Sequence, residues 1–329
     1  MTNREKADLF CKEWLEGKQV FNLQTSGSTG IPKVIELRRD QMIASAKKTI
    51  HALNLEEGMT SLVCLNVDFI AGKMMLVRGL VAGMKMTVVE PSSDPLGGLE
   101  HQKFGFAAMV PYQMRSPHLD AIETIIIGGA PISHELLDHI KQLKASCYAT
   151  FGMTETISHI ALQKLNGNDR QDYFELLDGI DISVDQQQRL IIKADYLKDP
   201  VITNDIVDRI DLRKFRWLGR YDNIINTGGI KVSPEKIEWI LAQYLNRRFF
   251  VAAKDHDQLG QQVVLVIEGT TSDISEAEER DLMEHLKAQL TRYEVPKQVL
   301  YTTDFVMTPT QKINRTLTLK NALPRPSGR

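Results

Sequence analysis

The 329-residue sequence has only three cysteines, and Cys11, Cys64 and Cys147 lie far apart without CxxC spacing. This odd, scattered set argues against a disulfide framework and against a zinc site. No apolar run approaches the length that spans a bilayer, and the first residues mix charges without the apolar stretch of a secretory signal. We therefore expect a protein of the reducing cytoplasm with no membrane partner.

An excess of charge of one sign is also missing. Lys and Arg number 40 against 42 Asp and Glu, which gives a formal net charge of -2, and the basic residues are spread along the chain. Without a basic patch nothing neutralises a phosphate backbone, so a nucleic-acid partner is not expected. The 43% hydrophobic content is that of a globular protein, and the length suits two unequal domains.

Helix and strand patterns alternate over the first part of the chain. Apolar residues at helical spacing predict helices at 4–16, 38–55 and 134–143, with further helices between the strands at 61–66 and 84–90 and after the strand at 106–110. Additional strands are predicted at 124–130 and 146–152. This alternation predicts a large α/β domain whose sheet is covered by helices.

The pattern changes after residue 175. Short strands interrupted by polar residues are predicted at 181–185, 189–194, 208–212 and 213–219, and they indicate a β-rich subregion that closes the first domain at residue 220. Residues 221–329 are expected to form a small α+β domain, with helices at 233–245 and 276–290 and strands at 248–253 and 263–269. The residues after Arg315 are expected to be a tail that does not fold.

The segment TSGSTGIPK, residues 25–33, has the composition of a phosphate-binding loop. Backbone N–H groups in such a turn, the hydroxyl side chains and a lysine ammonium are suited to phosphate oxygens. A Walker A loop is excluded because GxxxxGK[ST] is absent, and a flexible polar loop is the remaining alternative. The candidate phosphate ligands are Thr25, Ser26, Gly27, Ser28, Thr29, Gly30 and Lys33.

The segment FGMTET, residues 151–156, directly follows a predicted strand, where function concentrates in α/β sheets. Thr154 suits a hydrogen bond to phosphate, and Glu155 offers the hard oxygen ligand that Mg²⁺ prefers. Thr and Glu are also good residues for the first turn of a solvated helix, so this segment alone leaves both interpretations open.

Two later segments complete a pattern: GRYDNIINTGGIKVSPEKIE at 219–238 and PTQKINR at 309–315. In this order and at these separations, the segments from Leu23 to Arg315 resemble the acyl-adenylate-forming superfamily of acyl-CoA synthetases, adenylation domains and luciferases. The resemblance implies an acid–thiol ligase that uses ATP and Mg²⁺ to activate a small carboxylic acid as its AMP ester. It further implies that CoA is the cosubstrate that receives the acyl group.

The resemblance also implies roles for single residues around the nucleotide. Gly128, Gly129, Ala130 and Pro131 resemble the segment that lies along the adenine, with Phe151 and Gly152 on its other face. Thr154 and Glu155 would contact the α-phosphate and the magnesium ion. Asp205 and Arg220 would hold the ribose, although Asn204 stands where the family has a glycine.

The second domain of the family is mobile, and the resemblance makes Asp222 the hinge. Gly228, Gly229 and Lys231 resemble the loop used in thioester formation. Lys312 resembles the lysine that acts in adenylation, with Gln311 in place of the preceding glycine. The physical case for Lys312 is independent of the resemblance, because an ammonium near the α-phosphate stabilises the charge that builds up there.

Because the phosphate loop begins near residue 25, the long N-terminal subdomain of most relatives is expected to be largely missing. Short members of this kind resemble the o-succinylbenzoate–CoA ligases of menaquinone synthesis. In that subgroup an arginine and a serine hold the substrate, and Arg78 and Ser158 stand at the corresponding positions, with Lys73 and His159 beside them. An arginine suits the second carboxylate of that acid because it is always charged and can bind it with two N–H groups.

Alternatives remain for these residues and for the whole chain. Arg78 can also be a partly exposed helix residue, Ser158 a plain loop hydroxyl and His159 a structural histidine. The activated acid can be another aryl or fatty acid, and the acyl group can pass to a separate carrier protein instead of CoA. A catalytically inactive nucleotide-binding regulator is the alternative of a different class. The sequence leaves open whether the chain forms a homodimer.

Overall fold

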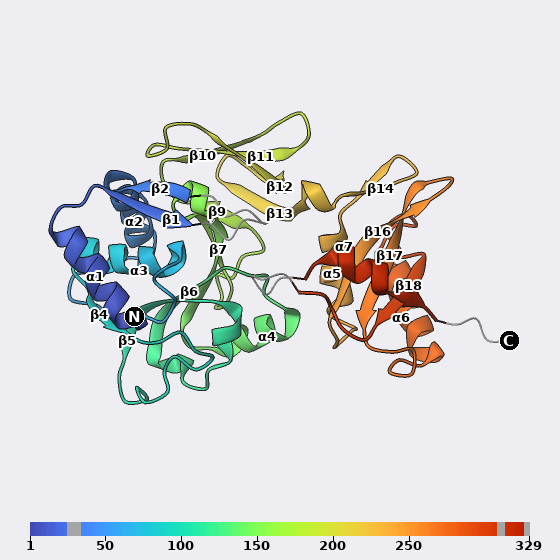
Figure 1. Ribbon diagram of the computed structural model, residues 1–329, viewed down its shortest axis with the longest axis horizontal. Helices are drawn as coiled ribbons and strands as arrows, with labels where there is room; N and C mark the ends of the chain where they lie inside the picture. The colour runs from blue at the N-terminus through green and yellow to red at the C-terminus, as the bar shows by residue number, and fades with distance from the viewer. Residues whose placement is uncertain (25–33, 308–312, 326–329) are drawn as a thin grey trace. The chain divides into compact units, whose positions relative to one another are not determined.

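The structure is a computed structural model that describes residues 1–24, 34–307 and 313–325 (Figure 1). The chain forms two compact units. The first comprises Met1–Thr203 and Asp208–Arg216, and the second comprises Asn204–Val207 and Trp217–Arg329. No helix in the described ranges is long and apolar enough to cross a membrane.

An eleven-stranded sheet organises the first unit, and its order is β10-β11-β12-β13-β9-β8-β7-β6-β5-β3-β4. The strands β3, β4, β5, β6 and β7 are parallel, whereas β8 runs antiparallel to β7 and to β9. The strand bounds are Thr60–Val63 for β3, Lys85–Val88 for β4, Phe104–Met109 for β5, Ile122–Ile127 for β6, Ser146–Gly152 for β7, His159–Lys164 for β8, Phe174–Leu176 for β9, Ile180–Val184 for β10, Arg189–Ala194 for β11, Val201–Arg209 for β12 and Lys214–Arg220 for β13. Residues of β12 and β13 are divided between the two units.

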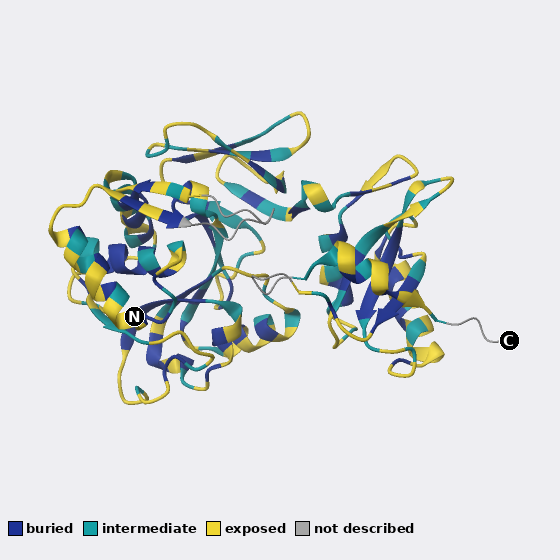
Figure 2. Cartoon of the chain, viewed as in Figure 1, coloured by how far each residue is buried: buried dark blue, intermediate teal, exposed yellow. Residues whose placement is uncertain are grey.

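The central parallel strands β5 and β6 are mostly apolar because both faces of this part of the sheet are covered. All six residues of β5 are buried, and β6 ends in the buried run Ile125, Ile126 and Ile127 (Figure 2). The predicted α/β class with covering helices is confirmed. The helices are α1 Asn3–Leu15, α2 Arg39–Ala52, α3 Ile70–Ala82 and α4 His134–Gln142.

Helix α3 is the most deeply buried helix of this unit. Six consecutive residues, from Met74 to Gly79, are buried. The helix is apolar nearly all round, as expected for a helix enclosed by the protein. Its one fully enclosed cation, Arg78, is only 2% exposed, so the sequence alternative of a partly exposed helix residue is wrong.

A two-stranded sheet lies between α1 and α2 in the chain. It pairs β1 (Val20–Gln24) with β2 (Val34–Arg38) in antiparallel register, from Val20 opposite Arg38 to Gln24 opposite Val34. Phe21 from β1 packs with Phe10 and Trp14 of α1, with ring centroids 4.9 and 5.7 Å away. The predicted phosphate loop connects the two strands and lies outside the described residues.

The second unit is built on a six-stranded sheet of order β15-β14-β17-β18-β19, in which β16 also pairs with β17. Its strands are β14 Ile225–Thr227, β15 Ile230–Val232, β16 Phe249–His256, β17 Gly260–Glu268, β18 Gln298–Thr302 and β19 Leu323–Pro324. Its helices are α5 Pro234–Leu241, α6 Glu276–Gln289 and α7 Arg315–Asn321. Apolar residues of β17, with Ile237 and Leu241 of α5 and Leu286 of α6, form the core of this α+β unit.

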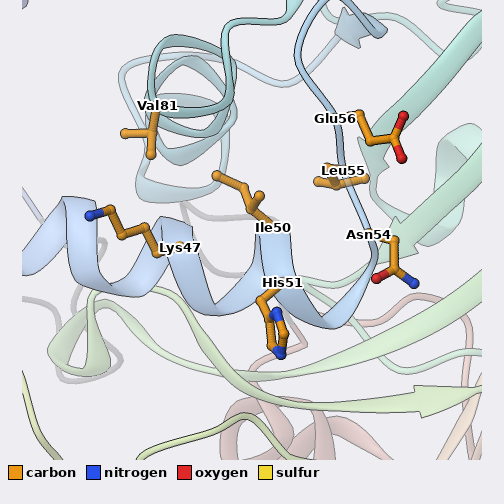
Figure 3. Close-up of a pocket in the computed structure, with 7 residues that line it drawn as sticks. All are labelled: Lys47, Ile50, His51, Asn54, Leu55, Glu56 and Val81. Atoms are coloured by element: carbon orange, nitrogen blue, oxygen red, sulfur yellow. The ribbon is translucent and has the colours of Figure 1, made fainter.

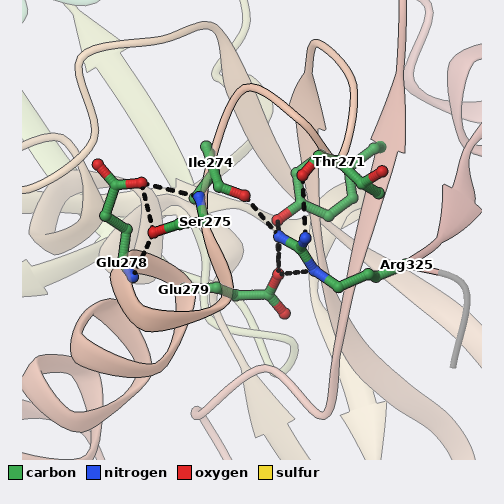
Figure 4. A network of polar contacts seen from close by, with 7 residues as sticks. Thr271, Ile274, Ser275, Glu278, Glu279 and Arg325 are labelled. Atoms are coloured by element: carbon green, nitrogen blue, oxygen red, sulfur yellow. Dashed lines mark hydrogen bonds and ion pairs between the residues drawn. The ribbon is translucent and has the colours of Figure 1, made fainter. Parts of the chain in front are cut away.

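The expectation of an unfolded tail after Arg315 is wrong. The chain continues into α7, capped by Asn314, and into β19, which pairs with β18. Arg325 then donates to the carbonyl oxygens of Thr271 (2.9 Å) and Ile274 (2.7 Å) and to the Glu279 carboxylate (3.0 Å) (Figure 4). These short elements form because tertiary contacts hold them, which no local pattern reveals.

Two further expectations need correction. The helix predicted after the strand at 106–110 is reduced to two short 3₁₀ turns, Pro111–Arg115 and Leu119–Ala121. Pro117 removes a backbone donor between these turns and disfavours helical backbone at the residue before it. The strand predicted at 208–212 lies earlier, because β12 ends at Arg209.

Arg315 connects α7 to the rest of the second unit. Its two terminal nitrogens lie 2.8 and 3.0 Å from the two carboxylate oxygens of Glu238, which also accepts from the Val251 N–H at 2.8 Å. Glu238 is 19% exposed, and burial raises the pKa of its carboxyl against the opposing effect of Arg315. We expect Arg315→Met to lower the free energy of unfolding by about 2 kcal/mol, because it leaves a partly buried carboxylate without its cation.

Chemical denaturation measures this loss. Arg280→Met, at an exposed position of α6, is the matched control and should change stability by less than about 0.5 kcal/mol. Adding Glu238→Gln to Arg315→Met should recover part of the loss. A double variant no more stable than Arg315→Met would show that the ion pair is not the cause.

Candidate functional site

The carboxyl ends of β5, β6 and β7 lie side by side, and the segment that follows β6 begins there. The Gly128 N–H donates to the Met109 carbonyl oxygen at 3.1 Å. A Cβ on Gly128 would lie 2.4 Å from the Thr150 hydroxyl oxygen, so a larger residue would displace that hydroxyl from its hydrogen bond to the Ile127 carbonyl oxygen. Gly129 has a φ of +86° and, with Ala130 and Pro131, is exposed. The structure thus places this predicted adenine segment at the edge where parallel sheets bind ligands.

Phe151, near the end of β7, belongs to an aromatic cluster. Its ring centroid lies 5.6 Å from that of Phe174 and 5.1 Å from that of Phe215, which is fully buried. These contacts fix the plane of the half-buried Phe151 ring. The next residue, Gly152, crosses the start of β8 so closely that a Cβ would lie 2.3 Å from the His159 Cα.

A tight loop joins β7 to β8. Thr154–Thr156 form one 3₁₀ turn, and Ile157 then adopts φ 67° and ψ -42°. The Ser158 N–H donates to the Thr156 carbonyl oxygen at 2.7 Å, which makes a γ-turn centred on Ile157. A positive φ at a buried β-branched residue is strained and persists only where the surroundings enforce it.

The buried side chain of Thr156 provides much of that enforcement. Its hydroxyl accepts from the Met153 N–H at 3.1 Å and lies 2.8 Å from the Ser158 carbonyl oxygen. The Tyr196 hydroxyl donates to the Thr156 carbonyl oxygen at 3.1 Å from outside the loop. Thr156 was not among the predicted site residues. It could have been suspected because it lies in the segment TETIS, between Glu155 and Ser158.

Glu155 is exposed at the tip of this loop, and Thr154 beside it is half-buried. No group of three or more His, Cys, Asp or Glu side chains able to hold a metal ion occurs among the described residues. A single carboxylate nevertheless fits Mg²⁺, which keeps several waters and takes phosphate oxygens as further ligands. Glu155 therefore has the exposure and the chemistry that its predicted role requires.

Arg78, from α3, meets this loop inside the protein. One terminal nitrogen donates to the Ser158 hydroxyl at 2.6 Å and lies 3.4 Å from His159 Nδ1. Its Nε is buried without a hydrogen-bond partner within the described ranges, and no described carboxylate pairs with it. Burial lowers the pKa of Arg78 to about 10, so the guanidinium stays charged at neutral pH. The structure thus brings Arg78, Ser158 and His159 together.

His159 is 6% exposed, and its Nε2 lies 3.0 Å from the hydroxyl of Thr49 on α2. Burial, followed by the charge of Arg78, holds the pKa of His159 well below its usual 6.5. The imidazole is therefore neutral at physiological pH. Thr49 was not predicted, because its contact with His159 spans 110 positions of the sequence.

Lys73 does not join this cluster, which corrects its expected place beside Arg78. On a helix, residues five positions apart point about 140° away from one another. The Lys73 ammonium lies 5.5 Å from the centre of the Phe10 ring on α1. Burial lowers the pKa of Lys73, against the charge of Asp68. Its contacts are those of a residue that packs α3 against α1.

Asp205 and Arg220 lie together in the second unit. Asp205 accepts from the Trp217 Nε1–H at 2.9 Å, and the nearest Arg220 nitrogen is 3.9 Å away. Burial raises the pKa of Asp205, while the Trp217 hydrogen bond and the Arg220 charge act in the opposite direction. Trp217 was not predicted, although it lies in the same segment as Arg220.

Asp222 is linked to the same group of residues. Its carboxylate accepts from Asn204 Nδ2 at 2.9 Å and from Arg220 at 3.2 Å. Asn204 lies within β12, and its side chain makes this contact with Asp222.

Gly228 and Gly229 form the two-residue turn between β14 and β15. Their φ values of 58° and 82° are those of the tight hairpin turn that matches strand twist. Thr227 pairs with Ile230, and Lys231 is exposed on β15. The turn thus presents Lys231 to solvent.

The remaining predicted residues lie outside the described ranges. They are Thr25, Ser26, Gly27, Ser28, Thr29, Gly30, Lys33 and Lys312. Met307 and Ile313, which flank Lys312 in the sequence, form an antiparallel bridge.

A surface hollow between α2 and α3 lies apart from these residues. It is lined by Lys47, Ile50, His51, Asn54, Leu55, Glu56 and Val81 (Figure 3). None of the predicted site residues lines it. The candidate site is therefore defined by the end of β7 and its loop.

The depressed pKa of His159 has a consequence for stability. Below pH 6.5 the unfolded chain binds a proton at this histidine, whereas the folded chain does not, so stability must fall as the pH falls. We expect wild type to lose about 2 kcal/mol more than His159→Gln between pH 7.5 and pH 5.0. Urea denaturation at a series of pH values measures the difference. His101→Gln, at an exposed position, is the control and should show the same change of unfolding free energy with pH as wild type. If His159→Gln also shows the wild-type change with pH, His159 is not neutral in the folded protein.

Comparison with known proteins adds independent information. The family model described as AMP-binding enzyme matches residues 9–186. The 2-succinylbenzoate–CoA ligase of Salmonella typhimurium is 27% identical over 304 residues, which cover 86% of this chain and 64% of the relative. The ligase of the same name from Escherichia coli K12 is 25% identical, with coverage of 83% and 62%. The chain therefore spans less than two thirds of these curated relatives.

Solved structures similar to this chain include members of the same kind of enzyme. An acyl-CoA synthetase (AMP-forming)/AMP-acid ligase II-like protein from Dyadobacter fermentans is 39% identical, with a TM-score of 0.65, 95% of this chain covered and 93% of that protein. The o-succinylbenzoate CoA synthetase of Bacillus subtilis, in complex with its acyl-adenylate intermediate, is 19% identical with a TM-score of 0.76 and coverage of 92% and 69%. The second likeness concerns the fold alone, and the first agrees with the resemblance drawn from the motifs. Because the family model matches more than half of the chain, this protein belongs to the AMP-binding enzyme family.

Proposed function

We propose that this chain is an ATP- and Mg²⁺-dependent acid–CoA ligase that works through an acyl-AMP intermediate, and that its acid is o-succinylbenzoate. The observation that carries the choice of acid is the buried, positively charged Arg78 without an acidic partner among the described residues. An enclosed cation of this kind is costly unless an anion pairs with it. A second carboxylate on the substrate supplies that anion.

The surroundings of Arg78 support this choice. Ser158 and His159 are its neutral partners, and neither cancels its charge. Both follow directly on the loop that carries Thr154 and Glu155, so the substrate residues and the nucleotide residues share one short segment. An acid held by Arg78 is thereby kept near the proposed α-phosphate position.

In the first half-reaction, a carboxylate oxygen of the acid attacks the α-phosphorus of ATP and pyrophosphate leaves. Mg²⁺, when bound, neutralises charge on the leaving pyrophosphate, and Glu155 would hold it. Thr154 would orient the α-phosphate, Asp205 and Arg220 the ribose, and Lys312 would stabilise the charge that develops. The loop at 25–33 would hold the outer phosphates, and the segment from Gly128 to Pro131 would line the adenine with Phe151 and Gly152.

In the second half-reaction, the CoA thiol attacks the acyl carbon, loses its proton and displaces AMP. We propose that residues 221–329 rotate about Asp222 between the half-reactions, so that the turn at Gly228 and Gly229 brings Lys231 toward the site. This proposal rests on the motif resemblance. Because the proposed reaction uses ATP and CoA, a cytoplasmic location is part of this proposal.

Pyrophosphate release with ATP and Mg²⁺, measured across a panel of acids with and without CoA, tests the proposed function. We expect the highest sustained turnover with o-succinylbenzoate and CoA together, and slower turnover of analogues that keep the reacting carboxylate. Faster turnover with another acid would keep the ligase and change its substrate, and release that depends on a carrier protein would change the acceptor. No release with any acid would favour a nucleotide-binding regulator.

The variant Arg78→Met tests whether Arg78 serves substrate binding or the stability of the fold. It removes the carboxylate partner, so we expect the KM for o-succinylbenzoate to rise about 100-fold, as for the loss of a charge-assisted contact. It also removes an uncompensated buried charge and fills the same space, so the free energy of unfolding of the ligand-free protein should rise by about 1–3 kcal/mol.

Steady-state kinetics and chemical denaturation measure these two effects. Arg115→Met, at an exposed position, is the matched control and should alter neither. A ligand-free Arg78→Met protein that is less stable than wild type would show that Arg78 serves the fold rather than the substrate.

A further inference from the structure

A line of hydrogen bonds leads from helix α2 to the guanidinium of Arg78. The Thr49 hydroxyl lies 3.5 Å from the Ser45 carbonyl oxygen, one turn earlier on α2, and 3.0 Å from His159 Nε2. The other ring nitrogen, Nδ1, lies 3.4 Å from the Arg78 nitrogen. Thr49, His159 and Arg78 are all buried.

The charge of Arg78 favours one arrangement of donors and acceptors along this line. Nδ1 also lies 3.5 Å from the Ser158 hydroxyl, but that hydroxyl already accepts from Arg78 at 2.6 Å and can turn its own hydrogen toward Nδ1. A guanidinium has only donors, so the nitrogen of His159 that faces it must be an acceptor. Nδ1 is therefore unprotonated, and the proton of the neutral ring is on Nε2. Nε2 then donates to Thr49, whose own O–H points back to the Ser45 carbonyl oxygen.

This arrangement orients Arg78 without neutralising it. Ser158 and His159 Nδ1 both accept from the same terminal nitrogen of Arg78, and neither carries a negative charge. The guanidinium plane is held from one side, while its Nε has no hydrogen-bond partner within the described ranges. An acidic residue in place of His159 would also orient Arg78, but it would cancel the charge that attracts an anion.

We infer that Thr49 and His159 are positioning residues that hold Arg78 in the orientation that selects an acid with a second carboxylate. This inference rests on the proposed function and extends it to residues that do not touch the reacting atoms. Thr49 sets the tautomer of His159, and His159 sets the plane of Arg78. Selectivity for a dicarboxylate is therefore controlled partly from α2.

The alternative is that Thr49 and His159 only fill the interior. Packing alone makes no demand on the tautomer, and its loss would impair every substrate alike. The positioning role instead requires the Nε2–H tautomer, and its loss must affect acids with a second carboxylate selectively. These two differences define the tests.

The first test needs no substrate and no variant of Thr49. Protein labelled with ¹⁵N in its eight histidines gives two-bond ¹H–¹⁵N correlations, and the signals missing from His159→Gln identify His159. We expect Nε2 at the shift of a protonated ring nitrogen and Nδ1 at that of an unprotonated one. A protonated Nδ1 would overturn the inference, whatever acid the enzyme uses.

The second test uses Thr49→Val, which keeps the shape of the side chain and removes its hydroxyl. The acids are o-succinylbenzoate and two analogues that each lack one of its carboxylates, 4-oxo-4-phenylbutanoate and 2-butanoylbenzoate. We expect the KM for o-succinylbenzoate to rise about tenfold, as for the loss of one buried hydrogen bond, and kcat to stay within about twofold. The KM of whichever analogue is turned over should change less than about twofold.

Two variants serve as controls. Thr49→Ser restores the hydroxyl and should return the KM for o-succinylbenzoate toward the wild-type value. Thr60→Val, at an exposed position of β3, makes the same exchange away from the cluster and should leave all constants unchanged. In Thr49→Val, an equal rise in KM for o-succinylbenzoate and for the analogue that is turned over would overturn the positioning role. So would the absence of any rise for o-succinylbenzoate.

The wild-type protein distinguishes this failure from failure of the proposed function. If wild type does not turn over o-succinylbenzoate, the proposed acid is wrong, and the tautomer measurement alone decides whether the hydrogen-bond line exists. If wild type prefers o-succinylbenzoate over the analogues and Thr49→Val keeps that full preference, the proposed function is supported and the positioning role of Thr49 is wrong.

Discussion

The close contact between Gly152 and the start of β8 determines the geometry of the candidate site. A Cβ at Gly152 would lie 2.3 Å from the His159 Cα and 2.5 Å from the Ser158 carbonyl oxygen, so the two backbones touch. The chain reverses between these points within six residues, and the reversal requires the strained γ-turn at Ile157. Thr156 holds that turn through hydrogen bonds to Met153 and Ser158.

This reversal puts a residue proposed for the nucleotide site and residues proposed for the acid site on one loop. Its outer end carries Glu155 in solvent, and its inner end carries Ser158 and His159 against Arg78. Arg78 reaches that point because α3 is buried along most of its length. The helix therefore carries a charge into a place where water cannot solvate it, and the cost is lowest when an anion is bound. Binding of a suitable anion and stability of the fold are thus linked.

Much of the fold was predictable because it depends on local periodicity. The apolar runs that form β5 and β6, the strand β7 and the helical spacing of α2 and α4 were identified from the sequence. The short elements after Arg315 were missed. Their seven-residue helix and two-residue strand gain stability from contacts such as Arg325 with Glu279, which are remote in sequence.

The site was predictable only in part, for the same reason. Motif resemblance pointed to Arg78, Ser158 and His159, which the structure brings together, although Arg78 and Ser158 are separated by 80 positions. It also pointed to Lys73, which the helical rotation turns toward α1 instead. No pattern in the sequence indicated Thr49 or Trp217, since the contact of each with a predicted site residue is a hydrogen bond between separate segments of the chain. Asn204 stands where the motif has a glycine. Its side chain donates to the Asp222 carboxylate. The neighbouring Asp205 still contacts Trp217 and Arg220. The exchange therefore leaves the proposed ribose residues in place and adds a hydrogen bond at the proposed hinge, so this departure from the motif is compatible with an active site.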